Sequence, residues 1–433
     1  MKSPLTIIAL LAATAAGLAQ PLSFIRSQPD IPVEASPNCV IAADLTGNGY
    51  IDLVTGDVDN TLTVLTNNGT GLFTLASTPT AGNFIQCVVA ADFNGDGRLD
   101  LATANWSDDT VSVLTNAGGG AFVLATNISV GDSPIWVAAA DVNGDGAIDL
   151  ICANSGDTTL TILTNDGHAN FKALSTNQVA GNPYFVLALD VNGDGLIDLV
   201  SANNDVDSVT VLTNCGRGAF GTAGTFKVGS APVSIAAADV AGAGRIDLIV
   251  ANSGGYTLTV LANKGGGTFA NYGTFIVGGE PQSVAAADVN GAGMVDLVSA
   301  NAYDNTLTVL LSEGNRWFAP GAIADTGNTP WSLAVADVNG DGKPDLICAN
   351  MSDGTVSVLT NSGQLVLSQP VCERTSGFRA LVRGDLGATY TIQASDDGIN
   401  WAPLQKVSMT NSACPFTDAY ADSPCRLYRA VSP

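Results

Sequence analysis

A nine-residue acidic phrase recurs seven times along the chain and contains the residue types most suited to chemistry. Its copies begin at Asp44, Asp92, Asp141, Asp190, Asp239, Asp288 and Asp337, spaced by 48 and then by 49 residues. In four intact copies, Asp, Asn and Asp hold positions one, three and five, Gly holds position six and Asp holds position nine. Alternate side-chain oxygens in a tight loop can converge on one hard cation, and the carbonyl at position seven can add a ligand. The pattern predicts Ca²⁺ rather than Mg²⁺, which keeps several waters.

The four intact loops predict about four structural calcium sites, each with five ligands in the same order. These are Asp92, Asn94, Asp96, Arg98 (carbonyl) and Asp100; Asp141, Asn143, Asp145, Ala147 (carbonyl) and Asp149; Asp190, Asn192, Asp194, Leu196 (carbonyl) and Asp198; Asp337, Asn339, Asp341, Lys343 (carbonyl) and Asp345. Loop one predicts a fifth, weaker site from Asp44, Thr46, Asn48 and Asp52.

Two loops lack expected ligands. Loop six has Ala292 at position five, and loop five has Ala241 and Ala243 at positions three and five, so we expect loop five to bind no metal. The simpler interpretation of all seven loops is that Asp-Gly turns cap hairpins. Clustered carboxylates without a cation would repel one another, and this favours metal binding in the intact loops.

The composition excludes several classes of function. Lys and Arg number 16 against 40 Asp and Glu, for a net charge of −24, so the chain has no basic surface for nucleic acid. It contains one histidine, His168, in the turn NDGHANF, and very few glutamates. General acid–base catalysis therefore has few candidate residues.

The elements around the loops read as short strands. In the third repeat the predicted strands are residues 136–141, 149–154, 159–165 and 171–179, rich in β-branched residues and separated by Gly, Asn and Asp. Four strands in about 49 residues are typical of a propeller blade, whereas a straight solenoid is the competing architecture. A strand at residues 22–27 completes the seventh blade and closes the ring. We therefore predict an all-β fold, a seven-bladed β-propeller of four-stranded blades with a small C-terminal β-sandwich-like domain.

The chain divides into three predicted segments. Residues 1–19 have one Lys, an apolar stretch and a small-residue end, as in a secretory signal peptide. Residues 20–366 form the propeller, and residues 371–433 form a small immunoglobulin-like β domain. We expect a monomer that is secreted, extracellular or periplasmic, without a membrane span.

The Asp loops flanked by strands resemble those of the FG-GAP or VCBS repeat family, which includes the integrin α-subunit propellers and related secreted lectins. The resemblance implies that the metals brace the turns between the first and second strands. The family serves adhesion, glycan binding and a few enzymes, so the resemblance does not identify a ligand.

The face opposite the Asp loops is the predicted binding surface. Aromatic residues beside Asp and Asn suit a sugar-binding surface, because rings pack on C–H faces while polar groups bond hydroxyls. The candidates are Trp106, Trp136, Tyr184 and Trp331. The alternative is that Trp136, Phe185 and Trp331 merely plug the centre of the ring. We predict a binding or adhesion scaffold for an extracellular glycan or protein; the alternative is a carbohydrate-active enzyme, a polysaccharide lyase or hydrolase.

The cysteines predict few disulfides. Cys152 and Cys348 lie in apolar strand contexts and are expected to be buried free thiols. Cys39 and Cys87 occupy equivalent positions in adjacent repeats, which leaves a pairing open. Cys414 and Cys425 are the best disulfide candidates.

Overall fold

The computed structural model describes residues 22, 24–26, 29–361, 366–373, 377–383, 389–395, 402–408, 413–418 and 427–431. The predicted signal peptide lies outside these residues. The described chain divides into two compact units, Arg26–Thr360 and a second unit that contains the C-terminal strands. Its helices are the short 3-10 turns η1 (Asn204–Val206) and η2 (Ser253–Gly255). No helix in the described part of the chain is long and apolar enough to cross a membrane.

The larger unit is a seven-bladed β-propeller of four-stranded antiparallel blades, as predicted. Six blades follow in chain order: β3 (Pro37–Ala43), β4 (Asp52–Asp57), β5 (Leu62–Asn67) and β6 (Phe73–Ser77); β7 (Ile85–Ala91), β8 (Asp100–Asn105), β9 (Thr110–Gly118) and β10 (Ala121–Ser129); β11 (Pro134–Ala140), β12 (Asp149–Asn154), β13 (Thr159–Asn165) and β14 (Phe171–Gln178); β15 (Pro183–Leu189), β16 (Asp198–Asn203), β17 (Ser208–Asn214) and β18 (Phe220–Lys227); β19 (Pro232–Ala238), β20 (Asp247–Asn252), β21 (Thr257–Gly265) and β22 (Thr268–Ile276); β23 (Pro281–Ala287), β24 (Asp296–Asn301), β25 (Thr306–Gly314) and β26 (Trp317–Asp325).

The seventh blade takes strands from both ends of the propeller sequence. Its inner strands are β27 (Pro330–Ala336), β28 (Asp345–Asn350) and β29 (Thr355–Asn361). The N-terminal strands β1 (Phe24–Arg26) and β2 (Ile31–Pro32) complete the same sheet. Ile31 pairs with Val356 and Pro32 with Thr355.

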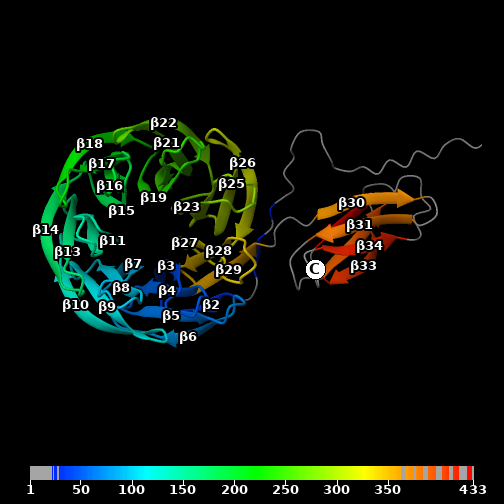
Figure 1. Cartoon of the computed structure of the whole chain (residues 1–433), viewed down its shortest axis with the longest axis horizontal. Helices are drawn as coiled ribbons and strands as arrows, with labels where there is room; N and C mark the ends of the chain where they lie inside the picture. Colours follow the sequence, from blue (N-terminus) through cyan, green and yellow to red (C-terminus); the bar gives the residue numbers. More distant parts are fainter. Residues whose placement is uncertain are drawn as a thin grey trace, which may run out of the picture. The chain divides into compact units, whose positions relative to one another are not determined.

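Figure 1 shows the first strand of each blade facing the centre of the ring and the fourth strand at its perimeter. The first strands, such as PIWVAAA in β11, are rich in Ala and Val, and small side chains fit where seven strands crowd together. Second strands such as DLICAN in β12 are buried along their whole length, because both of their faces pack against neighbouring blades.

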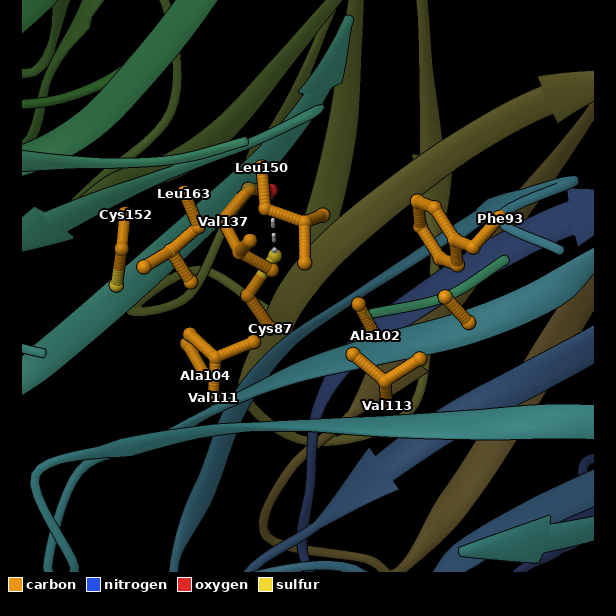
Figure 2. Packing of buried hydrophobic residues seen from close by; sticks show 11 residues of the cluster. Cys87, Phe93, Ala102, Ala104, Val111, Val113, Val137, Leu150, Cys152 and Leu163 are labelled. Carbon is orange, nitrogen blue, oxygen red and sulfur yellow. Dashed lines mark hydrogen bonds between the residues drawn. The ribbon is translucent and has the colours of Figure 1, made fainter. Parts of the chain in front are cut away.

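The hydrophobic core lies between adjacent blades. Figure 2 shows one such cluster, in which Cys87 and Phe93 of the second blade pack with Val137 and Leu150 of the third. The Sγ of Cys87 lies 3.7 Å from the carbonyl oxygen of Val137. Equivalent packing joins the seventh blade to the first, where Val356 and Val358 contact Val40 and Leu53.

Cysteines on the inner and second strands are free and buried. Cys39, Cys87, Cys152 and Cys348 are reduced thiols, so the pairing of Cys39 with Cys87 that the sequence left open does not form. Burial raises the pKa of the Cys87 thiol to about 12, which makes it unreactive. Cys425 lies outside the described residues, so the pairing with Cys414 stays a prediction.

The C-terminal unit contains two three-stranded sheets. One has the order β30 (Val366–Glu373), β31 (Gly377–Arg383), β34 (Ala413–Asp418); the other has the order β33 (Ala402–Ser408), β32 (Thr389–Ser395), β35 (Leu427–Val431). Its first strand begins at Val366, five residues before the predicted domain start. The immunoglobulin-like assignment stays a prediction.

Candidate metal loops and a candidate ligand pocket

Each Asp loop joins the first and second strands of its blade. In the third blade, Ala140, the last residue of β11, pairs with Asp149, the first residue of β12. The eight intervening residues turn sharply, and Gly144 and Gly146 adopt φ of 79° and 90°, which side chains rarely allow. All seven loops therefore lie on one face of the propeller.

Backbone amides hold the alternating side chains of the intact loops in place. Asp141 Oδ1 accepts a hydrogen bond from Gly144 N at 2.7 Å, and its Oδ2 accepts one from Gly146 N at 2.8 Å. Asn143 Oδ1 accepts from Asp145 N at 2.8 Å. The loops that begin at Asp92, Asp190 and Asp337 repeat these bonds.

The Asp at position nine is buried and fastens the loop to its own blade. Asp149 Oδ2 accepts from Val142 N at 3.1 Å, while Oδ1 accepts from Asn165 N on the third strand at 2.8 Å. Burial raises the pKa of Asp149 to about 6, and the nearby charges of Asp145 and Asp141 contribute to the rise. The pKa values of Asp100 and Asp198 are raised by burial in the same way.

The donor chemistry of the intact loops fits Ca²⁺. Carboxylate, amide and carbonyl oxygens are the ligands that this cation takes, and each carboxylate oxygen can accept more bonds than the amides use. Among the described residues, no three His, Cys, Asp or Glu side chains are close enough together to hold a metal ion. The loops thus have oxygens of the right type, while their own amides hold the acidic side chains too far apart to form a closed site in this arrangement.

Loop one differs from the intact loops at its third position. Asp44 accepts from Gly47 N and Gly49 N, both at 2.8 Å, as in the intact loops. The Thr46 hydroxyl, however, donates to Asp52 Oδ2 at 3.1 Å. Loop six keeps the same amide bonds to Asp288 and Asn290.

The buried Asp of loop five forms an ion pair with an arginine from the next blade. Arg316, from the turn between β25 and β26 in the next blade, donates from Nε to Asp247 Oδ2 at 2.8 Å and from Nη2 to Oδ1 at 3.0 Å. Asp247 is fully buried, and the Arg316 side chain is 18% exposed. The guanidinium carbon of Arg316 lies over the Tyr272 ring, 5.7 Å from the ring centroid. A guanidinium therefore neutralises the buried carboxylate in the loop that lacks two predicted ligands.

Asparagines on the third strands of the first five blades tie their blades to the Asp loop of the preceding blade. Asn165 Nδ2 donates to the carbonyl of Phe93 in the preceding loop at 2.8 Å and to that of Ile148 in its own loop at 3.0 Å. Asn67 makes the same bond to Val338 at 2.7 Å and so joins the first blade to the seventh. The sixth blade has Ser312 at this position, and there Arg316 N donates to the Val240 carbonyl at 3.4 Å.

A pocket of about 300 Å³ opens at the starts of the inner strands, on the face opposite the Asp loops. All seven blades contribute the residue six places before the first Asp: Asn38, Gln86, Ile135, Tyr184, Val233, Gln282 and Trp331. In four blades the following residue lines it too: Trp136, Ser234, Ser283 and Ser332.

A β-bulge explains why consecutive residues line the same pocket. Strict alternation would send Ile135 and Trp136 to opposite faces of the strand. The register between β11 and β12 shifts between Pro134 and Trp136, and the other six first strands have the same irregularity. Bulges re-aim side chains in this way near functional sites.

The structure brings three of the four predicted ligand residues together. Trp136, Tyr184 and Trp331 line the pocket. Trp136 also packs on Phe185, with ring centroids 4.2 Å apart. Trp106 is not among the lining residues; it is exposed and lies 5.6 Å from Phe84. Asn38, Gln86 and Gln282 were not predicted from the sequence. Each directly follows the Pro or Ile at the same position of its repeat, a regularity that could have revealed them.

His168 lies on the other face, in an exposed turn where its backbone N donates to Asp166 at 2.9 Å. The pocket and His168 are therefore on opposite sides of the propeller.

Comparisons with known proteins agree with this architecture. The profile of the FG-GAP-like repeat matches residues 44–103, 92–152, 190–250, 239–299 and 288–348. BBS1N, solved in complex with ARL6DN, superposes with a TM-score of 0.59 at 13% identity, over 78% of this chain and 97% of that one. A proposed 6-phosphogluconolactonase from Bacteroides uniformis gives 0.55 at 16% identity, over 68% and 86%. A search of curated proteins gave no match. At these identities the structural likeness is one of fold alone.

Proposed function

This chain belongs to the FG-GAP-like repeat family, and we propose that it is an exported, calcium-braced β-propeller that binds an extracellular glycan or protein. The ligand binds on the face opposite the Asp loops. The Asp loops hold structural calcium and take no part in ligand contact. Export depends on residues 1–19, and the protein acts as a monomer.

The observation that carries the proposal is the pocket at the starts of the inner strands. It receives at least one side chain from every blade, and the seven equivalent positions hold six residue types, namely Asn, Gln, Ile, Tyr, Val and Trp. A repeat that keeps its framework and varies one position around a shared cavity can build an asymmetric ligand site.

Calcium in this proposal is a structural brace. Position-nine carboxylates are buried near other acids of the same loop, and burial raises the pKa of Asp149 to about 6. A cation at the intact loops would stabilise the charged form of these carboxylates against burial and against the nearby acids, and the available oxygens are of the type that Ca²⁺ prefers. In loop five the guanidinium of Arg316 already does so for Asp247.

Binding is better supported than catalysis. BBS1N, a propeller of the same fold, was solved with a protein bound. The residues that line the pocket include no Asp, Glu, His, Lys or Arg. Glycoside hydrolysis ordinarily needs two carboxyl groups beside the scissile bond. The pocket thus has groups that recognise a ligand and lacks those that would cleave one.

The test is a binding screen of the purified full chain, in calcium, against arrays of extracellular glycans and matrix proteins. We expect saturable binding to at least one class, and no release of products from a panel of polysaccharides. Turnover of a polysaccharide would favour the enzyme instead, and an absence of binding across both arrays would contradict the scaffold.

A further inference from the structure

The pocket at the starts of the inner strands is uncharged within a strongly acidic protein. The chain carries 40 Asp and Glu, yet the pocket is lined by apolar, aromatic, amide and hydroxyl side chains only. An anionic ligand would find no countercharge there and would be repelled by the net charge of −24. A cationic ligand would be attracted by the same net charge but would find no carboxylate in the pocket to pair with. The lining therefore selects an uncharged ligand.

The aromatic rings and the glutamine amides of the pocket come from different blades. Trp136 and Tyr184 come from the third and fourth blades, and Trp331 comes from the seventh. Gln86 and Gln282 come from the second and sixth blades. Within the described residues, the structure gives neither glutamine side chain a hydrogen-bond partner, so their amides are available to a ligand.

The serine hydroxyls of the pocket are oriented by the neighbouring blades. Ser234 Oγ accepts from Val284 N at 3.3 Å, Ser283 Oγ accepts from Leu333 N at 3.3 Å, and Ser332 Oγ accepts from Val40 N at 3.1 Å. Each hydroxyl keeps its own proton to donate. The pocket thus offers donors and acceptors in fixed positions beside aromatic plates.

The enclosure of the pocket restricts how a ligand enters. Because all seven blades supply wall residues, the wall surrounds the pocket, and the end of a polymer can reach its floor more readily than an internal segment can. The volume of about 300 Å³ is at the lower end of the range for ligand sites. A short terminal group fits this space better than an extended segment does.

From these observations we infer that the pocket binds the terminal residue of a neutral glycan, end-on. Aromatic rings pack on the C–H face of the sugar, while Gln86, Gln282 and the serine hydroxyls bond its hydroxyl groups. This inference rests on the proposed function and narrows it to a ligand class and a place on the non-loop face.

The experiment titrates the full chain, in calcium, with neutral hexose trisaccharides and with matched trisaccharides that end in a uronic or sialic acid. We expect at least one neutral trisaccharide to bind ten times or more as tightly as its acidic match. Trp331→Ala and Gln282→Leu should each weaken that binding at least tenfold, with unchanged circular dichroism. Gln282→Leu keeps the side chain's size, so it separates lost bonding from lost packing. Trp317→Ala is the matched control, because Trp317 is 61% exposed on the outer strand of the sixth blade.

The outcomes distinguish a wrong pocket assignment from a wrong proposed function. If binding is lost in Trp106→Ala and kept in Trp331→Ala and Gln282→Leu, the pocket assignment is wrong although the face is right. Preference for acid-terminated trisaccharides, or binding of a protein at the pocket in place of sugars, would overturn the neutral-glycan inference. If neither glycans nor matrix proteins bind at all, both this inference and the proposed function are wrong.

Discussion

The guanidinium of Arg316 binds the carboxylate of Asp247 through two hydrogen bonds, across 69 residues and from one blade to the next. The pair sits where loop five has Ala241 and Ala243 in place of the Asn and Asp of the intact loops. In six loops, Asp at position nine accepts from the amide at position two, as Asp149 does from Val142. In loop five, the Val240 amide instead donates to the Ala238 carbonyl, and Arg316 takes its place at Asp247. The arginine thus stabilises a loop that lacks metal ligands.

Replacing Arg316 should destabilise the propeller independently of calcium. Arg316→Ala leaves the buried Asp247 carboxylate without a counter-ion, although Asn263 N still donates to its Oδ1 at 2.9 Å. Breaking such buried ion pairs costs about 3–5 kcal/mol. Because Arg316 is partly exposed, we expect a loss of about 2–4 kcal/mol in urea unfolding, equal in calcium and in EDTA. Arg245→Ala, at an exposed residue of the same loop, is the control. Adding Asp247→Asn to Arg316→Ala should recover part of the loss. Equal stability of the two single arginine variants would show that the ion pair does not support the loop.

Calcium should raise the melting temperature chiefly through the four intact loops. A ligand that binds only the native state at 100 times its Kd stabilises by about 2.7 kcal/mol per site. Asp190 holds position one of an intact loop, and Asp239 holds position one of loop five, which lacks two ligands. Both carboxylates accept hydrogen bonds from backbone amides of their own loops. Asp190→Asn should shrink the calcium-induced rise in melting temperature, whereas Asp239→Asn should leave it unchanged. A melting curve that EDTA does not alter in the unmodified protein would refute structural calcium.

The repeat made the fold predictable. Alternating β-branched residues and Gly, Asn and Asp turns predicted strands at residues 149–154 and 159–165, which are the bounds of β12 and β13. The constant spacing of the repeats also predicted that Trp136, Tyr184 and Trp331 lie on the same face of the propeller. Two features could not be derived in this way. The pairing of Arg316 with Asp247 depends on how adjacent blades pack. The bulge after the Pro or Ile of each first strand brings two consecutive side chains into one pocket, whereas regular alternation would place them on opposite faces of the strand.

Asp57 should make stability depend on pH. Six blades have Asn where the first blade has Asp57, which is fully buried and accepts from Thr55 and Thr63 hydroxyls at 2.8 and 2.7 Å. Burial raises the pKa of Asp57 from 3.8 to about 6. The native state therefore holds the proton more tightly than the unfolded chain, and stability falls as pH rises from about 4 to 6.

Asp57→Asn should remove this loss, because the amide carries no charge and can donate to Thr63 as Asn105 donates to Ser112. Each pKa unit corresponds to 1.36 kcal/mol, so we expect a gain of about 1–3 kcal/mol at pH 7.5 and almost none at pH 4. Thermal unfolding in saturating calcium at both values measures this. Asp325→Asn, at an exposed residue, is the matched control. A gain that is the same at both pH values would argue against titration of Asp57.

Closure of the ring should depend on the N-terminal strands. β2 pairs with β29, Val33 N donates to the Gly354 carbonyl at 3.0 Å, and Asp30 accepts from the Ser357 hydroxyl at 2.8 Å. Deleting residues 20–32 would leave β29 as an unpaired edge, which favours aggregation. We expect the deletion to lower the melting temperature sharply or to abolish cooperative unfolding.

A point variant tests the same closure without removing backbone pairing. The Ser357 hydroxyl also accepts from Asn350 Nδ2 at 2.8 Å and from Gly327 N at 3.2 Å, so Asp30 orients a group that links three segments of the seventh blade. Asp30→Ala removes this partly buried bond to a charged group and also the ion pair of Asp30 with Arg26 at 2.9 Å, and it should cost about 1–2 kcal/mol. Removing residues 366–433 is the control, because the unit Arg26–Thr360 does not include them. If that truncation unfolds the propeller while the deletion of residues 20–32 is harmless, the N-terminal strands do not close the ring.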